Sequence, residues 1–337
     1  MVNKKKREVI LTGMRPTGFL HLGHYLGALE NWLDLQDKYK SYFLIADYQA
    51  LGDHIDQTDN IRQSVVEMVI DWLAVGLDPD KSTFVIQSYI PEFSELFMLL
   101  SMIIPIAYVE RNPTLKAEMA QLKKKDISLG FFNYPASQVA DILLFKANLV
   151  PVGEDQLPHI ELTSDIAKKF NRIYGDVFPM PKPLVGRVSR LVGTDGNAKM
   201  SKSLDNCIYL SDSEEVLKKK VMKMYTDPTR LRATDPGHVE NNPVFIYLDA
   251  FCKDKEMLED LKEKYKKGGI GDVVVKEILF KELNDFLAPI RERREHFKKD
   301  KKFIEEFIKK GTVEAKKTAE ETLIAVRSAM KIIDYEK

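Results

Sequence analysis

Short apolar runs alternate with longer amphipathic segments in the first half of the chain. The apolar runs, which predict buried strands, are Val9–Leu11, Tyr42–Ile45, Thr83–Ile86 and Leu149–Val152. The segments expected to be helical, from apolar spacing or from their length, are 22–37, 60–74, 94–104 and 156–170. Strands that alternate with helices predict an α/β fold, a doubly wound parallel sheet with helices on both faces. Ligands bind at the carboxyl ends of the strands in such a sheet.

The second half of the chain has a different pattern, because its apolar residues follow a helical period from about residue 213. We therefore expect a C-terminal helical domain. Lysine and arginine are frequent there, and one cluster contains Arg291, Arg293 and Arg294. A single cluster of this kind is expected to be a solvated helix face.

Composition narrows the class of protein only a little. The 337 residues carry 51 basic and 51 acidic side chains, so any nucleic-acid surface must be a local patch. Two cysteines, Cys207 and Cys252, are too few for a disulfide framework or a cysteine zinc site, which fits a reducing cytoplasm. No stretch approaches the roughly 20 apolar residues of a membrane span. The first apolar run is too short for a signal peptide.

The stretch RPTGFLHLGHYLGAL, residues 15–29, joins the first predicted strand to the first predicted helix. Gly23 leaves room beside a helix N-terminus, where free N–H groups and the helix dipole favour anions. The imidazoles of His21 and His24 could donate to a phosphate as its charge grows in a transition state. The alternative is two ordinary histidines at the start of a helix.

A second motif, KMSKS, spans residues 199–203 in a glycine-containing loop. Its lysines and serines could close on a pyrophosphate leaving group and stabilise its charge. The alternative for this motif alone is a polar surface loop. HLGH and KMSKS together resemble the two adenylate-forming signatures of the class I aminoacyl-tRNA synthetases. This resemblance implies a Rossmann-type catalytic domain, with His21, His24, Lys199, Lys202 and Ser203 as its catalytic residues.

Further strings resemble one family within that class, the tryptophanyl-tRNA synthetases. They are YPASQVADILL and VPVGEDQLPHIELT within residues 133–171, DWLAVGLDP at 71–79, ERNPT at 110–114 and YTDPTRLRATDPG at 225–237. The resemblance covers nearly the whole chain. It implies that ATP activates L-tryptophan to tryptophanyl-adenylate with release of pyrophosphate, and that the tryptophan then passes to the 3′ end of its tRNA.

The resemblance assigns Asp141 as the acceptor of the indole N–H. The chemistry agrees, because indole offers one donor and a carboxylate on an apolar helix needs a donor if it is buried. Within the fold, Asp141 could instead form only a cap or an ion pair. Gln138 lies on the same helical face and is the alternative acceptor. The tryptophan-binding residues implied in this way are Asp141, Tyr134, Gln138, Gln49 and Gln156, the last as a contact of the α-amino group.

The ATP site implied by the resemblance draws on four segments. Its residues are Arg15, Pro16, Thr17, Gly23, His24, Gly153, Glu154, Asp155, Val188, Lys199, Met200, Ser201, Lys202 and Ser203. Asp155 would accept from the ribose hydroxyls, and the backbone at Val188 would hold the adenine. Two positions depart from many relatives: Arg15 replaces a glutamine, and Gln49 replaces a histidine. Arg15 would bring a positive charge close to the α-phosphate and the substrate carboxylate.

The resemblance also implies the domain organisation and the partners. We expect a catalytic domain at 1–195. Residues 196–337 would hold the KMSKS loop and a helical anticodon-binding domain, whose last helix packs back on the catalytic domain. Mg²⁺ would arrive with ATP, without a protein-bound metal, and the chain would be a cytoplasmic homodimer with no membrane contact. Arg293 and Arg294 are candidates for contacts to tRNA phosphates.

Three functions remain open on the sequence. The first is activation of tryptophan, the second is activation of tyrosine on the same fold, and the third is a non-catalytic RNA-binding paralogue. A buried carboxylate can also meet a phenol O–H, so Asp141 alone does not separate the first two. The intact HLGH and KMSKS motifs argue against the third. Pyrophosphate exchange dependent on tryptophan or on tyrosine distinguishes among them.

Overall fold

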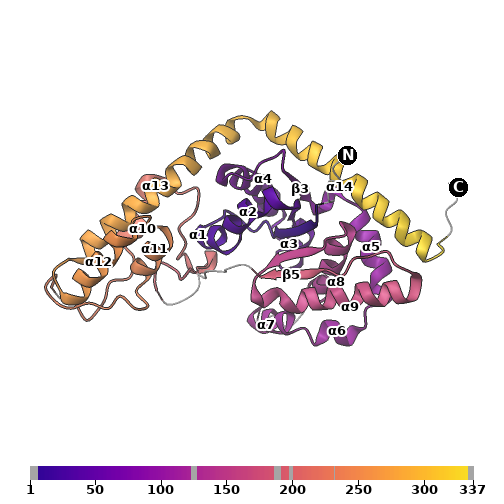
Figure 1. The fold of residues 1–337 in the computed structure, drawn as a ribbon, viewed down its shortest axis with the longest axis horizontal. Coiled ribbons are helices and arrows are strands. Elements are labelled where there is room, and N and C mark those ends of the chain that lie inside the picture. Colours follow the sequence, from indigo (N-terminus) through magenta and orange to yellow (C-terminus); the bar gives the residue numbers. More distant parts are fainter. Residues whose placement is uncertain (1–6, 123–126, 186–190, 197–199, 231, 333–337) are drawn as a thin grey trace, which may run out of the picture.

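A computed structural model describes residues 7–122, 127–185, 191–196, 200–230 and 232–332 of the chain (Figure 1). Its sheet has five parallel strands in the order β3-β2-β1-β4-β5. The strands are β1 (Val9–Met14), β2 (Lys40–Ile45), β3 (Ser82–Ile86), β4 (Leu149–Val152) and β5 (Lys182–Val185). The strand order reverses between β1 and β4, and in open α/β sheets this switch point is where ligands bind.

Helices cover both faces of the sheet, as the sequence predicts. On β2, Phe43 packs on one face, where Trp32 stacks on it with ring centroids 4.8 Å apart. Tyr42 packs on the other face, where Phe145 stacks on it at 4.6 Å. Because both faces are buried, the strands read as continuous apolar runs and not as alternating ones.

The helical segments continue through the whole chain. In the first half they are α1 (Leu22–His24), η1 (Tyr25–Leu29), α2 (Glu30–Lys38), α3 (Asp47–Asp53), α4 (Thr58–Val75), η2 (Gln87–Tyr89), α5 (Glu92–Ser101), α6 (Ile106–Glu110), α7 (Pro113–Leu122), α8 (Leu129–Leu144), η3 (Glu154–Gln156) and α9 (Leu157–Tyr174). In the second half they are η4 (Lys202–Leu204), α10 (Glu214–Met222), α11 (Pro243–Phe251), α12 (Lys255–Lys267), α13 (Asp272–Lys299) and α14 (Lys301–Ala329).

The structure differs from the predicted elements at the first helix and at the last strand. The helix expected over 22–37 is interrupted by the π-helical segment η1, which lies directly after the HLGH motif. A π-helical turn inside a helix is rare and occurs mostly at functional sites. The fifth strand, β5, was not predicted, because its four residues include a proline and are half-exposed to exposed, so they form no apolar run.

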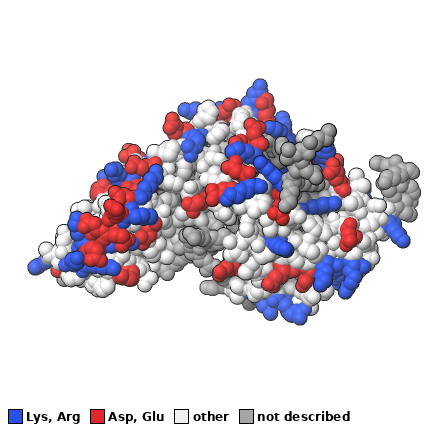
Figure 2. All heavy atoms as spheres, in the orientation of Figure 1, with Lys and Arg blue, Asp and Glu red and all other residues white. Residues whose placement is uncertain are grey.

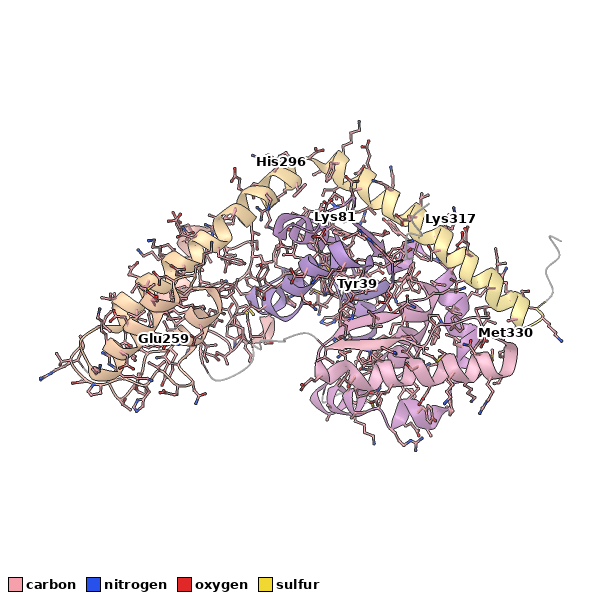
Figure 3. All side chains as sticks on the ribbon, in the orientation of Figure 1. Tyr39, Lys81, Glu259, His296, Lys317 and Met330 are labelled. Atoms are coloured by element: carbon pink, nitrogen blue, oxygen red, sulfur yellow. The ribbon has the colours of Figure 1, made fainter. Side chains whose placement is uncertain are left out.

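The two longest helices form an arch over the sheet (Figures 1 and 3). They meet near Asp300, whose side chain accepts the N–H of Phe303 and so caps α14. Along its length α14 lies against β3 and α5. The backbone of α14 approaches β3 closely at Gly311, where an added Cβ would lie 2.6 Å from the carbonyl oxygen of Phe84. Arg327 also forms a two-pronged ion pair with Glu95 of α5, both contacts at 2.6 Å.

Two arginines of the α13 cluster, Arg293 and Arg294, face the first half of the chain. The Arg294 side chain is buried and pairs with Asp71 and with Glu67 of α4, the latter at 2.6 Å. Nε of Arg293 donates to the carbonyl of Ala74 at 2.5 Å. The prediction of a solvated basic face is therefore wrong for Arg294, because the middle of α13 packs on α4 and this guanidinium meets two carboxylates there.

The surface shows no large region of a single charge on the face drawn in Figure 2, where acidic and basic side chains are interspersed. This agrees with the even count of the two kinds. Among the described residues, no helix is both long enough and apolar enough to cross a membrane.

Candidate active site

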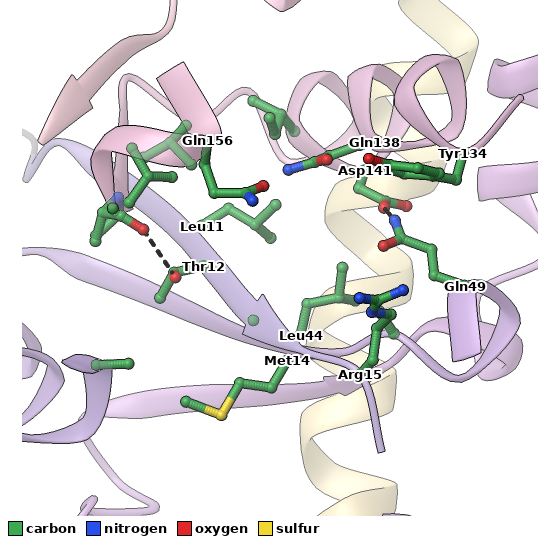
Figure 4. A pocket seen from close by; sticks show the side chains of 18 of the residues that line it. Leu11, Thr12, Met14, Arg15, Leu44, Gln49, Tyr134, Gln138, Asp141 and Gln156 are labelled. Carbon is green, nitrogen blue, oxygen red and sulfur yellow. Dashed lines mark hydrogen bonds between the residues drawn. The ribbon is translucent and has the colours of Figure 1, made fainter. Parts of the chain in front are cut away.

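A cavity of about 310 Å³ opens at the carboxyl ends of β1 and β4, at the switch point of the sheet (Figure 4). It brings together seven residues that the sequence predicts for the site, namely Arg15, Gln49, Tyr134, Gln138, Asp141, Gly153 and Gln156. Gly27 and Ala28 of η1 also line it, so the segment after HLGH faces the same space.

Most of the cavity wall is apolar. Leu11 and Leu44 come from β1 and β2, Phe131 and Ile142 from α8, and Val150 from β4. Figure 4 shows Tyr134 and Gln138 of α8 on one side of the open space, with Met14, the last residue of β1, and Arg15 on the other. An apolar cavity with a few placed polar groups is the usual form of a small-molecule site.

Asp141 is the most deeply buried polar group of the cavity. Its two carboxylate oxygens each accept an amide N–H, from Gln49 at 2.5 Å and from Gln87 at 2.7 Å. Burial raises the pKa of the carboxyl to about 7, although the two amides act in the opposite direction. Each oxygen has a second lone pair, so the carboxylate can accept one more donor from a ligand. An apolar group with one N–H or O–H suits this position.

Tyr134 is held by a chain of buried polar groups. Nδ2 of Asn112 lies 3.2 Å from Nδ1 of His159, and Nε2 of His159 lies 3.4 Å from the Tyr134 hydroxyl. The side-chain oxygen Oδ1 of Asn112 accepts the N–H groups of Thr114 and Leu115 in α7, which orients the side-chain nitrogen Nδ2 toward His159. Burial lowers the pKa of His159 to about 4, so this imidazole is neutral near pH 7. The neutral ring then carries its proton on Nε2 and donates it to Tyr134.

The two histidines of HLGH stack on each other at the start of α1. Their ring centroids are 3.8 Å apart, and Nδ1 of His24 accepts the backbone N–H of His21 at 3.1 Å. This bond leaves the proton of a neutral His24 on Nε2, where it can be donated. A Cβ on Gly23 would lie 2.9 Å from Nδ1 of His21. The glycine thus makes room for the neighbouring His21 ring.

The backbone around His21 is held by two other segments. The N–H of Leu20 donates to Asp71 of α4 at 3.3 Å. The chain that follows KMSKS pairs with it antiparallel, through bonds between Leu22 and Ile208 and between Leu210 and Leu20. The HLGH motif is therefore hydrogen-bonded through its backbone to the segment that follows KMSKS.

Part of KMSKS can be placed against the first motif. Nζ of Lys202 donates to the carbonyl of Thr17 at 3.2 Å, and burial lowers the pKa of this lysine. Met200 is buried, with its sulfur 3.5 Å from the position of a Cβ on Gly23. The N–H of Ser201 donates to Asn206 at 2.7 Å. Lys199, Val188 and the side chain of Ser203 lie outside the described residues.

The remaining predicted ATP residues lie in two turns. Pro16 is buried, and the N–H of Thr17 donates to the carbonyl of Arg15 at 3.0 Å. In the other turn, Glu154 and Asp155 are exposed in η3 just after β4. Exposed carboxylates beside a strand end can accept hydrogen bonds from sugar hydroxyls without the unfavourable free energy of burying a charge.

Three residues of the site were not predicted from the sequence. Gln87 follows β3 directly, and its place at a strand's carboxyl end was a usable signal. His159 lies within the family-like string HIELT but was given no role. Glu118 of α7 lines the cavity, and no pattern pointed to it, because α7 is a short helix with little periodicity. Within the described ranges, no group of three or more histidine, cysteine and acidic side chains could hold a metal ion.

Comparisons with known proteins agree on one family. The family model of the class I tRNA synthetases for W and Y matches residues 3–288. The tryptophan–tRNA ligase of Clostridium longisporum is 51% identical over 332 residues, which cover 97% of each chain. That of Chlamydia caviae is 47% identical over 98% of this chain and 97% of its own.

A solved structure with a similar fold is that of tryptophanyl-tRNA synthetase from Campylobacter jejuni complexed with ADP and tryptophan. It is 35% identical, with a TM-score of 0.87 over 96% of this chain and all of the other. The two ligases above are 51% and 47% identical to this chain over nearly its full length, and identity at that level indicates the same activity as well as the same fold. It does not favour tyrosine as the substrate. The chain therefore belongs to the class I tRNA synthetases and, within them, to the tryptophan–tRNA ligases.

Proposed function

We propose that this ligase binds L-tryptophan in the cavity between β1 and β4, with the indole N–H on Asp141. The buried carboxylate between Gln49 and Gln87 is the observation that carries the proposal. Indole has one donor and no acceptor, so a single acceptor in an apolar wall matches it. A smaller apolar side chain would leave the acceptor without its donor and the cavity partly empty.

The reaction that we propose has two steps. The carboxylate of tryptophan attacks the α-phosphorus of ATP, a bond to phosphorus forms, and pyrophosphate leaves. The terminal ribose hydroxyl of the tRNA then attacks the activated carbonyl, and AMP leaves. The side chains orient the reactants and stabilise charge, and no covalent intermediate with the protein is needed.

Groups from both signature motifs would surround the phosphates. Nε2–H of His24 and the ammonium of Lys202 carry protons that can be donated to phosphate oxygens. Their strength as donors increases as the leaving pyrophosphate gains charge, so they stabilise the transition state more than bound ATP. We propose the same role for His21, Lys199 and Ser203. Mg²⁺ would enter as the complex with ATP, held by phosphate oxygens and water.

Amino-acid-dependent pyrophosphate exchange tests the substrate assignment. We expect exchange of labelled pyrophosphate into ATP with tryptophan in the absence of tRNA. Tyrosine should support exchange at least 100-fold less efficiently, because its phenol is shorter than indole and places its O–H differently. Equal exchange with the two amino acids would contradict the assignment.

The second half of the chain is our candidate for tRNA recognition. We propose the boundary at residues 195 and 196, with a catalytic domain before it and the KMSKS loop and helical domain after it. Helices α10 to α13 form the body of that domain, and α14 returns across β3. Arg294 is not proposed as a tRNA contact, because it is buried in ion pairs. Charge reversal at an exposed lysine of α12, such as Lys267, is the better test.

A second copy of the chain is the proposed partner for an apolar surface on α5 and α6. Four large side chains there are exposed, namely Met98, Met102, Ile106 and Tyr108. Such clusters of exposed apolar side chains often mark protein interfaces. Sedimentation velocity should show a dimer for the unsubstituted chain and a monomer for Met102→Glu. The cytoplasmic location is proposed from the cysteines, since Cys207 and Cys252 are both free thiols.

A further inference from the structure

Glu118 places a second carboxylate in the cavity, apart from Asp141. It lies on α7 and lines the same space as Tyr134, Gln49 and Arg15. One of its oxygens, Oε1, lies 3.7 Å from the guanidinium of Arg15. The other, Oε2, is buried and has no hydrogen bond of standard geometry to a described residue, although the phenol of Tyr134 lies close enough to interact with the Glu118 carboxylate. A buried carboxylate needs hydrogen-bond donors, and each of its oxygens has two lone pairs, so Glu118 can accept a further donor from a ligand.

The charges beside this oxygen do not cancel. Arg15 lies between two carboxylates, those of Glu118 and of Asp53, which is 3.2 Å away. These three described groups together carry one excess negative charge, and the imidazole of His54 lies 2.7 Å from the other oxygen of Asp53. The Arg15 side chain is also 40% exposed, so water screens its attraction for Glu118. A ligand that brings one positive charge would restore the balance.

Tyr134 has the geometry to share such a ligand with Glu118. Its oxygen faces His159 on one side, and burial together with the Glu118 carboxylate raises the pKa of the phenol. The phenol therefore keeps its proton and can donate it toward that carboxylate. Its oxygen retains a lone pair for a further donor.

From these contacts we infer that Glu118 binds the α-ammonium group of the amino acid, while Arg15 lies near its α-carboxylate. The two residues together would recognise both charged groups of the amino acid. The inference rests on the proposed function, because it takes tryptophan as the ligand of this cavity. It adds a specificity-determining residue, since Glu118 would select amino acids over indole compounds that lack the amine. An ammonium has three donors, so Tyr134 and Gln156 can share it with Glu118.

Binding of three indole ligands to the full chain tests the inference. L-tryptophan carries both head groups, tryptamine carries only the ammonium, and indole-3-propionate carries only the carboxylate. Calorimetric dissociation constants would be compared for the unsubstituted chain, for Glu118→Gln, and for Glu110→Gln as the control. Glu110 is an exposed carboxylate in α6. Thermal melting verifies that each variant is folded.

The expected result is selective. Glu118→Gln should raise the dissociation constants of tryptophan and tryptamine by about tenfold or more. The dissociation constant of indole-3-propionate should stay the same or fall. Glu110→Gln should change none of the three. An equal loss for all three ligands, or a loss for indole-3-propionate and tryptophan but not for tryptamine, would overturn the inference. In the latter case Glu118 would act only by holding Arg15. Absence of tryptophan binding by the unsubstituted chain would contradict the proposed function itself.

Discussion

Replacement of Asp141 by asparagine should remove the pH dependence of tryptophan binding. The carboxyl is fully buried, and its pKa is raised to about 7. Near neutral pH the free protein is therefore a mixture of charged and protonated forms. An indole N–H favours the charged form, because the carboxylate accepts it with a charge-assisted bond. Tryptophan then binds with release of a proton, and its affinity falls as the pH falls.

The magnitude follows from the pKa. With a pKa of about 7, roughly one tenth of Asp141 is charged at about pH 6 and roughly nine tenths at about pH 8. If tryptophan selects the charged form, its dissociation constant rises about tenfold between these two values. Asp141→Asn keeps an acceptor oxygen but loses the charge. It should weaken binding at about pH 8 by roughly 1 to 1.5 kcal/mol, or about 5- to 12-fold.

The same pKa predicts the sign of the effect on stability. An unfolded aspartate loses its proton near pH 4, whereas folded Asp141 loses it near pH 7. Between these values the folded state binds more protons, so stability falls as the pH rises through this window, by up to about 4 kcal/mol. Asp141→Asn has no carboxyl group to ionise at this position, so its folding stability should not show this fall. A loss of tryptophan affinity at about pH 8 is therefore not expected to come with a loss of folding stability.

Calorimetry at three pH values would measure the effect, with L-tryptophan and with an analogue in which sulfur replaces the indole nitrogen. The analogue has no N–H, so its dissociation constant should change little with pH or with the substitution. His159 has a pKa of about 4 and does not titrate in this range. Equal pH dependence for both ligands, or its persistence in Asp141→Asn, would refute the reasoning. Gln138 would then become the candidate acceptor.

Three further predictions concern the signature motifs and the junction between α13 and α4. Lys202→Ala should slow pyrophosphate exchange by at least about 100-fold with little change in tryptophan affinity, and a matching loss of both would point to misfolding. His21→Ala and His24→Ala should each slow exchange, with a joint effect smaller than the sum of their free energies, and unchanged exchange in both would exclude the role. Arg294→Met should destabilise the fold by about 3–5 kcal/mol in urea titration, because it leaves Asp71 buried without its partner, and the double variant with Asp71→Asn should recover part of that loss.

The strands and the ligand cavity were accessible from the sequence for one physical reason. A parallel sheet buried on both faces requires continuous apolar runs, and four of its five strands have them. The carboxyl ends of those strands then locate the site. Strand β5 was not predicted, because it joins the sheet through backbone pairing with β4 while its side chains are half-exposed or exposed, so it has no apolar run.

The polar support of the site was less accessible. Asn112 acts through an amide group whose partner is distant in sequence, so no local spacing reveals it, and Gln87 is marked only by its place directly after β3. The burial of Arg294 was also not accessible from the sequence. Its lysine-rich surroundings suggest solvent, but its burial depends on where a 28-residue helix crosses α4. Helix positions follow from periodicity, whereas the partner of each charged face depends on tertiary packing.

The most direct test of the central claim is the crystal structure of this chain with L-tryptophan bound. The distance to measure joins the indole nitrogen to the nearer carboxylate oxygen of Asp141. We predict about 2.7–3.2 Å, the range of an N–H···O hydrogen bond, with the ring between the apolar walls of the cavity. An indole nitrogen more than about 3.5 Å from both oxygens, or a tryptophan bound outside this cavity, would contradict the account.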